Sequence, residues 1–305
     1  MTLRTLRLDT TADDAVSVYA DDVELLRYVH RPDMPQFEGP KPYLHPVRTL
    51  AGDVVTAYRP HDHRWHKGIQ MTASHVSGQN FWGGGSYVRD QGYVDLPNIG
   101  TMRHEEFTAS ETGAAGDRVH VAQRLTWHTS AGEHWVDEQR ELTVRDADET
   151  SWALEFATEL TNVRGEPLVF GSPTTNGRPQ AGYSGLFWRG PRAFTDGRVL
   201  AGNGQSGGPE LMGRAAPWLA YTGRHDEVDR ASTLLFIDHP GNDKQAPTRW
   251  FVREEPFAAV NPSIAFSQEV ELAPGDTLRL RYRVVVADGE WDRARLESYV
   301  AAHPW

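Results

Sequence analysis

The sequence contains no cysteine among its 305 residues. This absence excludes disulfide bonds, thiolate metal ligands, iron–sulfur clusters and a cysteine nucleophile. Any bound metal would therefore need histidine, carboxylate or carbonyl ligands.

The sequence also has no run of about 18 apolar residues, the length that a membrane-spanning helix needs. Its first residues, MTLRTLRLDTTADDAV, lack the uninterrupted apolar stretch of a secretory signal. We therefore expect a protein without a membrane partner, located in the cytoplasm.

Basic residues are outnumbered by acidic ones, and the formal net charge is −11. Nucleic-acid binding requires a basic face that displaces counterions, so the composition argues against a nucleic-acid partner. The chain is instead rich in tryptophan and tyrosine, with ten of each. Flat aromatic rings pack in protein cores and also stack on the apolar faces of sugar rings.

Period-two alternation of apolar and polar residues is common in the chain, and helical periodicity is scarce. It predicts strands over 119–129, 134–146 and 151–163, and a turn at 273–276 between two further strands. Only the stretch 290–303 has a helical pattern. We predict an all-β fold over residues 1–305 as one domain, a large antiparallel two-sheet sandwich with a short C-terminal helix.

Two long stretches, 78–102 and 170–197, show no clear strand pattern. They are rich in glycine, aromatic residues and arginine, and loops of this length usually build a functional site. The three glycines Gly83–Gly85 would let the backbone approach a ligand or another strand closely. We expect both stretches to be ordered loops.

The segment RPHDHRWHKG, residues 59–68, has the highest density of titratable groups. A strand that includes Val54 and Val55 is expected to end at its proline. If the backbone stays extended, His61 and His63 share a face, and His66 follows.

These histidines have three possible roles. Two or three neutral imidazoles and a distal carboxylate would suit a divalent metal such as Zn²⁺, Fe²⁺ or Mn²⁺ on His63 and His66. Imidazole also transfers protons near neutral pH, and Asp62 could orient one of the rings or cap the turn. The third role is to fix the loop by hydrogen bonds to its backbone. The pattern slightly favours proton transfer, with no resident metal or other cofactor. We expect Lys67 to be solvated.

Other residue types suited to sugar binding occur elsewhere in the chain. Glu138 and Arg140 point to the same side of an extended strand, where they could serve a site or form an ordinary ion pair. Arginines, tryptophans and an asparagine in glycine-punctuated loops could form the rim of a site for a polar or anionic small molecule. The candidate binding residues are His61, Asp62, Trp82, Arg140, Asn176, Arg178, Tyr183, Trp188, Arg189, Trp250 and Arg253.

Several of these segments together resemble a bacterial family of unknown function that carries the label "methane oxygenase PmoA". They are PYLHPVRTLAGDVVTAYRPHDHRWHKGI, NFWGGGSY, AGYSGLFWRGPR, TRWFVREEPF and LAPGDTLRLRYRVVVADG, which fall between residues 43 and 289. The block P-x-D-H-x-x-H-x-G, here Pro60, Asp62, His63, His66 and Gly68, is the most specific part. His61 lies at a position outside that pattern.

The resemblance implies a link to sugar metabolism, because members are encoded beside sugar oxidoreductases and glycoside-degrading enzymes. It also implies a fold similar to the large sandwich of the aldose epimerase (galactose mutarotase) superfamily, in which histidines and a carboxylate on a concave sheet act on a sugar. The oxygenase label itself refers to a membrane protein and does not suit this sequence.

The leading hypothesis is a carbohydrate-active enzyme that cleaves a glycosidic bond of a small glycoside by hydrolysis or elimination. His63, His66 and Glu138 would be its catalytic residues, with a sugar or glycoside as partner and a homo-oligomer as a further option. Three alternatives remain: a sugar mutarotase or epimerase, a non-catalytic sugar-binding module, and a soluble metal-dependent oxygenase.

Overall fold

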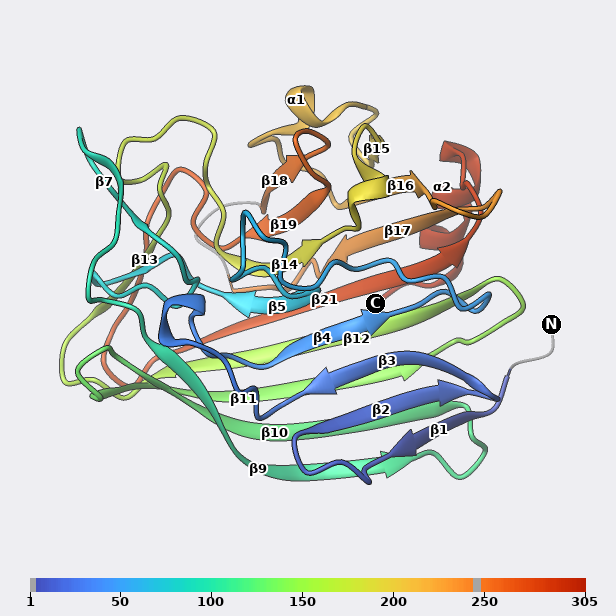
Figure 1. Cartoon of the computed structure of the whole chain (residues 1–305), viewed down its shortest axis with the longest axis horizontal. Helices are drawn as coiled ribbons and strands as arrows, with labels where there is room; N and C mark the ends of the chain where they lie inside the picture. Colours follow the sequence, from blue (N-terminus) through green and yellow to red (C-terminus); the bar gives the residue numbers. More distant parts are fainter. Residues whose placement is uncertain (1–3, 244–247) are drawn as a thin grey trace.

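The computed structural model describes residues 4–243 and 248–305. Two eight-stranded sheets lie face to face (Figure 1), and every hydrogen-bonded strand pair in them is antiparallel. The first sheet runs in the order β1 (Leu6–Asp9), β2 (Ala15–Ala20), β3 (Val23–Val29), β4 (Tyr43–Val47), β5 (Ile69–Thr72), β14 (Gly185–Arg189), β19 (Ala259–Ser263) and β18 (Arg249–Arg253). The second sheet runs in the order β15 (Arg198–Ala201), β16 (Trp218–Arg224), β17 (Ala231–Asp238), β21 (Thr277–Asp288), β12 (Ser151–Asn162), β11 (His134–Arg145), β10 (Arg118–His128) and β9 (Thr101–Thr112).

Smaller elements flank the two sheets. β20 (Val270–Leu272), β13 (Leu168–Gly171) and β6 (His75–Val76) form a three-stranded sheet, and β7 (Ser86–Val88) pairs with β8 (Gly92–Val94) in a hairpin. The short helices are η1 (Gln36–Glu38), η2 (Arg192–Phe194), α1 (Gly208–Leu211) and α2 (Arg293–Ala302). Within the described ranges, no helix has the length and apolar character needed to cross a membrane.

The predicted fold class is confirmed. β10, β11 and β12 match the three predicted strands, and in β10 alternate residues such as Val119 and Val121 point into the core between the sheets. The predicted helix is α2, which begins after Asp292, whose side chain accepts a hydrogen bond from the backbone of Arg295. Leu296 of this helix packs against Trp291 in a small cluster on the second sheet.

Two local expectations are wrong. The stretch 170–197 contains β14, an interior strand of the first sheet, as well as loop. Residues 54–57 form no strand, because their backbone instead makes single bridges and bonds to neighbouring segments. The predicted turn at 273–276 is confirmed, since it lies between β20 and β21; β20 pairs with β13, and β21 pairs with β12 and β17.

A buried polar network lies between the two sheets. Glu138 on β11 accepts bonds from Nε and Nη2 of Arg140 at 2.7 and 2.9 Å, and both side chains are about 1% exposed. Trp127 and Thr158 donate to the same carboxylate at 2.7 and 2.8 Å. The other Arg140 nitrogen donates to the hydroxyl of Tyr28 on β3, so the network links both sheets. Glu138 and Arg140 are therefore structural, which corrects their expected catalytic and binding roles.

We predict that Glu138→Gln destabilises the protein by about 3 kcal/mol, because it leaves Arg140 buried without a counter-charge. Urea unfolding measures the loss. The matched control is Glu106→Gln, which removes an exposed ion pair: the side chains of Glu106 and Arg124 are 58% and 59% exposed. This variant should unfold at a urea midpoint near that of wild type. Equal midpoints for the two variants would contradict the structural role.

Candidate functional site

One corner of the first sheet is covered on both faces. In β14, Leu186 and Trp188 join the core between the sheets, whereas Phe187 belongs to a separate aromatic cluster on the outer face. In β18, Trp250 points inward and Phe251 outward in the same alternation. The outer face of this corner is the floor of the candidate site.

A pocket of about 460 Å³ lies over this floor, within the range of roughly 300–1,000 Å³ that is typical of small-molecule sites. Its walls come from the loop at 59–68, the glycine-rich segment 81–85, the hairpin β7–β8, the loop before β14 and the turn between β18 and β19. Most of the lining is aromatic. The lining residues are Phe37, His63, Trp65, His66, Trp82, Gly83, Gly85, Tyr93, Asp95, Arg178, Tyr183, Phe187, Phe251, Arg253, Pro256 and Phe257.

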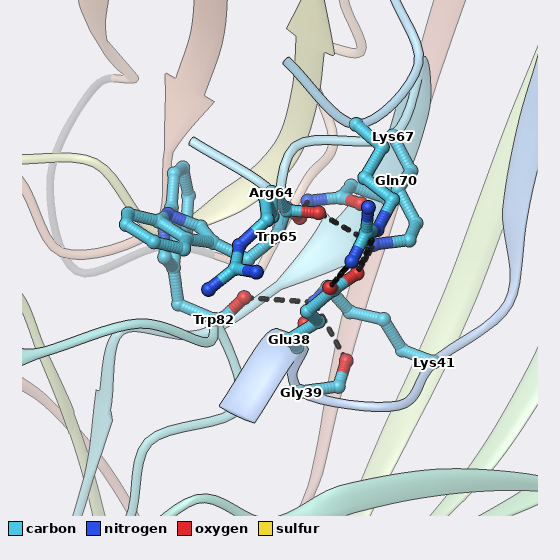
Figure 2. A network of polar contacts seen from close by, with 9 residues as sticks. Glu38, Gly39, Lys41, Arg64, Trp65, Lys67, Gln70 and Trp82 are labelled. Carbon is cyan, nitrogen blue, oxygen red and sulfur yellow. Dashed lines mark hydrogen bonds and ion pairs between the residues drawn. The ribbon is translucent and has the colours of Figure 1, made fainter. Parts of the chain in front are cut away.

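A buried ion pair fixes the loop at 59–68 beside the pocket. Nζ of Lys67 lies 2.6 Å from Oε2 of Glu38, and both side chains are at most 2% exposed (Figure 2). Arg59 donates to the same carboxylate through Nε and Nη2, and Lys67 also donates to the carbonyl of Arg64 at 2.6 Å. Although burial opposes it, these hydrogen bonds lower the pKa of Glu38. The expectation of a solvated Lys67 is therefore wrong.

Glycines let the segments around the pocket approach one another. Gly68 has φ +57°, and a Cβ there would lie 2.0 Å from the carbonyl oxygen of Leu44. Gly84 has φ +67°, and its Cβ would lie 2.7 Å from the indole of Trp65. Both positions therefore require glycine.

His66 is a buried, neutral imidazole. Its Nδ1 lies 3.3 Å from Nη1 of Arg189, and because a guanidinium only donates, the ring proton lies on Nε2. Burial, and next the cation of Arg189, hold the pKa of His66 well below its ordinary value. Arg189 itself is fully buried, with its Cζ 3.7 Å from the ring centre of Phe257, and burial lowers its pKa to about 10.

His63 stacks on His66, with ring centres 4.8 Å apart, and faces the pocket with a third of its side chain exposed. Its Nδ1 lies 3.4 Å from Oδ2 of Asp62. Burial lowers the pKa of His63, and the carboxylate of Asp62 partly offsets this. Asp62 is held in turn by Arg192, whose Nη2 lies 3.0 Å from Oδ1. This geometry gives a neutral imidazole at the pocket wall, with a carboxylate close to its Nδ1.

A hydroxyl and guanidinium cluster forms another part of the wall. The hydroxyls of Tyr93 and Tyr183 lie 2.6 Å apart, and Nη1 of Arg178 donates to Tyr93. Burial raises the pKa of Tyr183 well above its ordinary value, so the phenol stays protonated. Arg253 lines the same pocket, with its Cζ 5.3 Å from the ring centre of Phe251.

The structure brings together part of the predicted set. Six predicted residues line the pocket: His63, His66, Trp82, Arg178, Tyr183 and Arg253. Two more lie next to it, Arg189 against the lining residue Phe257 and Asp62 beside His63.

The remaining predicted residues lie elsewhere. Trp188 and Trp250 point into the core and donate to the carbonyls of Val55 and Ala216 at 2.8 and 2.9 Å. Asn176 contacts His75 at 3.5 Å and is not a lining residue. His61 is exposed and faces Arg192, because a turn at Pro60 replaces the extended backbone that would have aligned it with His63. Glu138 and Arg140 lie between the sheets, as described above.

Sequence reasoning missed several lining residues, among them Phe37, Trp65, Tyr93, Asp95 and Phe257. The segment GLFWR at β14 carried a usable signal, since an almost continuous apolar run indicates a strand buried on both faces. Glu38 carried no such signal, because its partners Arg59 and Lys67 lie more than 20 residues away.

A metal site on His63 and His66 does not fit these residues. Glu138, its expected carboxylate ligand, is enclosed by the network between the sheets. A guanidinium lies against Nδ1 of His66, where it would repel a cation. Over residues 4–243 and 248–305, no three His, Cys, Asp or Glu side chains gather as a metal-binding group.

Fold and site define a β-sandwich protein with an aromatic, histidine-containing pocket on the outer face of one sheet. A sequence model of the DUF6807 family, a family of unknown function, matches residues 15–301. The chain therefore belongs to this family. A comparison with curated proteins finds no match.

Solved structures with a similar arrangement of strands include two α-galactosidases and a lyase. The Lactobacillus brevis α-galactosidase gives a TM-score of 0.45 at 11% identity over 98% of this chain and 41% of its own. The GH36 α-galactosidase AgaB of Geobacillus stearothermophilus gives 0.47 at 13% identity over 93% and 41%. A mutant of the heparan sulfate lyase HepC of Pedobacter heparinus gives 0.40 at 10% identity over 95% and 36%. The chain thus spans about two fifths of the length of these proteins.

We predict that Glu38→Gln loosens the loop at 59–68, because Lys67 loses its buried counter-charge. Limited digestion with trypsin, read by mass spectrometry, should show faster cleavage after the exposed Arg64 than in wild type. The control is Glu166→Gln, whose carboxylate is 70% exposed. Cleavage at equal rates in the two variants would show that the ion pair does not hold the loop.

Proposed function

We propose that the protein is a carbohydrate-active enzyme that cleaves a glycosidic bond in its aromatic pocket by acid–base chemistry. The observation that carries this proposal is the neutral imidazole of His63, which faces the pocket and has the carboxylate of Asp62 3.4 Å from its Nδ1. A neutral imidazole accepts a proton, and the nearby carboxylate stabilises the imidazolium that forms. Trp82 and Phe257 offer apolar surface to the ring of a sugar.

The lining favours elimination over hydrolysis. Glycosidases use two carboxyl groups on either side of the scissile bond. Among the described lining residues Asp95 is the one carboxylate, since Asp62 lies behind His63. Elimination needs a base near an acidified C–H and an acid near the leaving oxygen, and it requires no second carboxylate.

Each part of an elimination has a residue that suits it. His63 removes a proton from a ring carbon next to a carbonyl group, and that electron pair forms a carbon–carbon double bond as the C–O bond on the next carbon breaks. The leaving oxygen takes a proton from the phenol pair Tyr93 and Tyr183. His66, with its proton fixed on Nε2, is a hydrogen-bond donor beside His63.

Proton transfer by His63 predicts a large loss of turnover in His63→Ala, by about 10²–10⁴-fold. NMR spectroscopy of a panel of glycosides and oxidised glycosides measures the rate and identifies the product. His128→Ala, on β10 of the second sheet, is the matched control. Turnover that survives in His63→Ala would contradict the assignment. A hydrated product would indicate hydrolysis, anomeric exchange would indicate mutarotation, and binding without turnover would indicate a sugar-binding module.

The pH profile gives a second test. Because burial lowers the pKa of His63, activity that needs its neutral form is fully present above that pKa and is lost as pH falls through it. The acid limb of kcat/KM should therefore lie below about 6.5, the ordinary value for histidine. Asp62 raises the pKa of His63, so Asp62→Asn should move the limb to lower pH. A limb that moves upward in Asp62→Asn would contradict the assignment.

A further inference from the structure

The pocket contains two arginines without an acidic partner. Arg178 donates to the neutral hydroxyl of Tyr93 and lies over the same ring, with its Cζ 4.9 Å from the centre. Arg253 lies over the ring of Phe251. Among residues 4–243 and 248–305, no carboxylate lies within ion-pair distance of either guanidinium.

Most other partly or fully buried arginines among the described residues pair with an acid, and the fully buried Arg189 is the exception. Arg140 pairs with Glu138 at 2.7 Å, and Arg283, which is 2% exposed, pairs with Glu155 at 2.8 Å. Even the partly exposed Arg59 pairs with Glu38 at 2.6 Å. The chain as a whole is acidic, with a formal net charge of −11. The two pocket arginines are therefore a local concentration of positive charge in an acidic protein.

Arg178 and Arg253 line the same pocket. The charges of Arg178 and Arg253 both act on the hydroxyl of Tyr183, against the burial that raises its pKa. Burial lowers the pKa of Arg253, and the charge of Arg178 lowers it further. A third cation, Arg189, lies against the lining residue Phe257, with its Cζ 3.7 Å from the ring centre. Half-buried like charges repel one another unless an anion lies between them.

We propose that the pocket recognises a sugar acid, whose carboxylate lies between the guanidinium groups of Arg178 and Arg253. This inference rests on the proposed function for the class of ring, and adds the charged group. A guanidinium binds a planar carboxylate through two parallel hydrogen bonds, which a neutral hydroxymethyl group cannot reproduce. The aromatic walls accept the apolar face of the ring.

The same contact would assist elimination. The ring carbon that carries the carboxylate has an acidic C–H only when the negative charge of that group is offset, since the proton loss adds a second negative charge. Two guanidinium groups supply that offset. His63 would take the proton, the new double bond would form as the adjacent C–O bond breaks, and the leaving oxygen would take a proton from the phenol pair.

Calorimetric titration of matched ligands tests the proposal. Methyl glucuronide and methyl glucoside differ only in the carboxylate, as do the corresponding galactose derivatives. We expect wild type to bind one of the acids about 10- to 100-fold more tightly than its neutral partner, the size of hydrogen bonds to a charged group. Arg253→Met should remove most of this preference for the acid. Arg178→Met should have the same effect, and because Arg178 lies in a loop, this variant keeps the test available if Arg253→Met does not fold.

The control for charge alone is Arg124→Met, on the exposed face of the second sheet, which should keep the preference. Equal affinity for acid and neutral sugar, or tighter binding of glucose 6-phosphate, would overturn the carboxylate assignment. The outcomes separate the two proposals. Neutral glycosides that are bound and cleaved would leave the proposed function standing without the sugar acid. Binding of sugar acids that depends on the arginines but leads to no turnover would support sugar-acid recognition and contradict the proposed enzymatic function.

Discussion

The site depends on a corner of the first sheet that is covered on both faces. Every residue of β5, β14 and β19 is buried, whereas β10 alternates between buried and more accessible positions. Burial on both faces makes each strand serve two purposes, since one set of side chains packs the core while the other forms the pocket floor. Trp188 and Phe187, adjacent in β14, therefore belong to different clusters.

Burial sets the protonation state of the imidazoles at this corner. The floor and the surrounding loops take His66 and Arg189 out of water, and both this burial and the nearby cations, Arg189 first, keep the imidazole neutral. His63 lies closer to solvent and is paired with Asp62, and it is the imidazole suited to gain and lose a proton. The buried pair of Glu38 and Lys67 (Figure 2) fixes the loop that carries both imidazoles. Sites with such displaced pKa values are frequently functional.

The fold was largely predictable from sequence, because period-two alternation in β10, β11 and β12 reflects a half-buried sheet. Interior strands such as β14 were harder to predict, since burial on both faces removes the alternation. The histidine segment contributes His63 and His66 to the lining of the pocket. Glu138, the carboxylate expected beside them, lies between the sheets, because sequence gives the face of a strand but not what that face packs against. The carboxylate that lies beside His63 is its neighbour in sequence, Asp62.

The central claim is that a sugar ring binds over the corner of β14 and β18 with its reacting carbon beside His63. A crystal structure of the protein with a bound methyl hexuronide tests this most directly. We expect the sugar ring to lie against Trp82 and Phe257, with its carboxylate between Arg178 and Arg253. One ring C–H should face the imidazole of His63. A ligand bound elsewhere, for example in the groove lined by Arg224 and His225, would contradict this placement of the sugar.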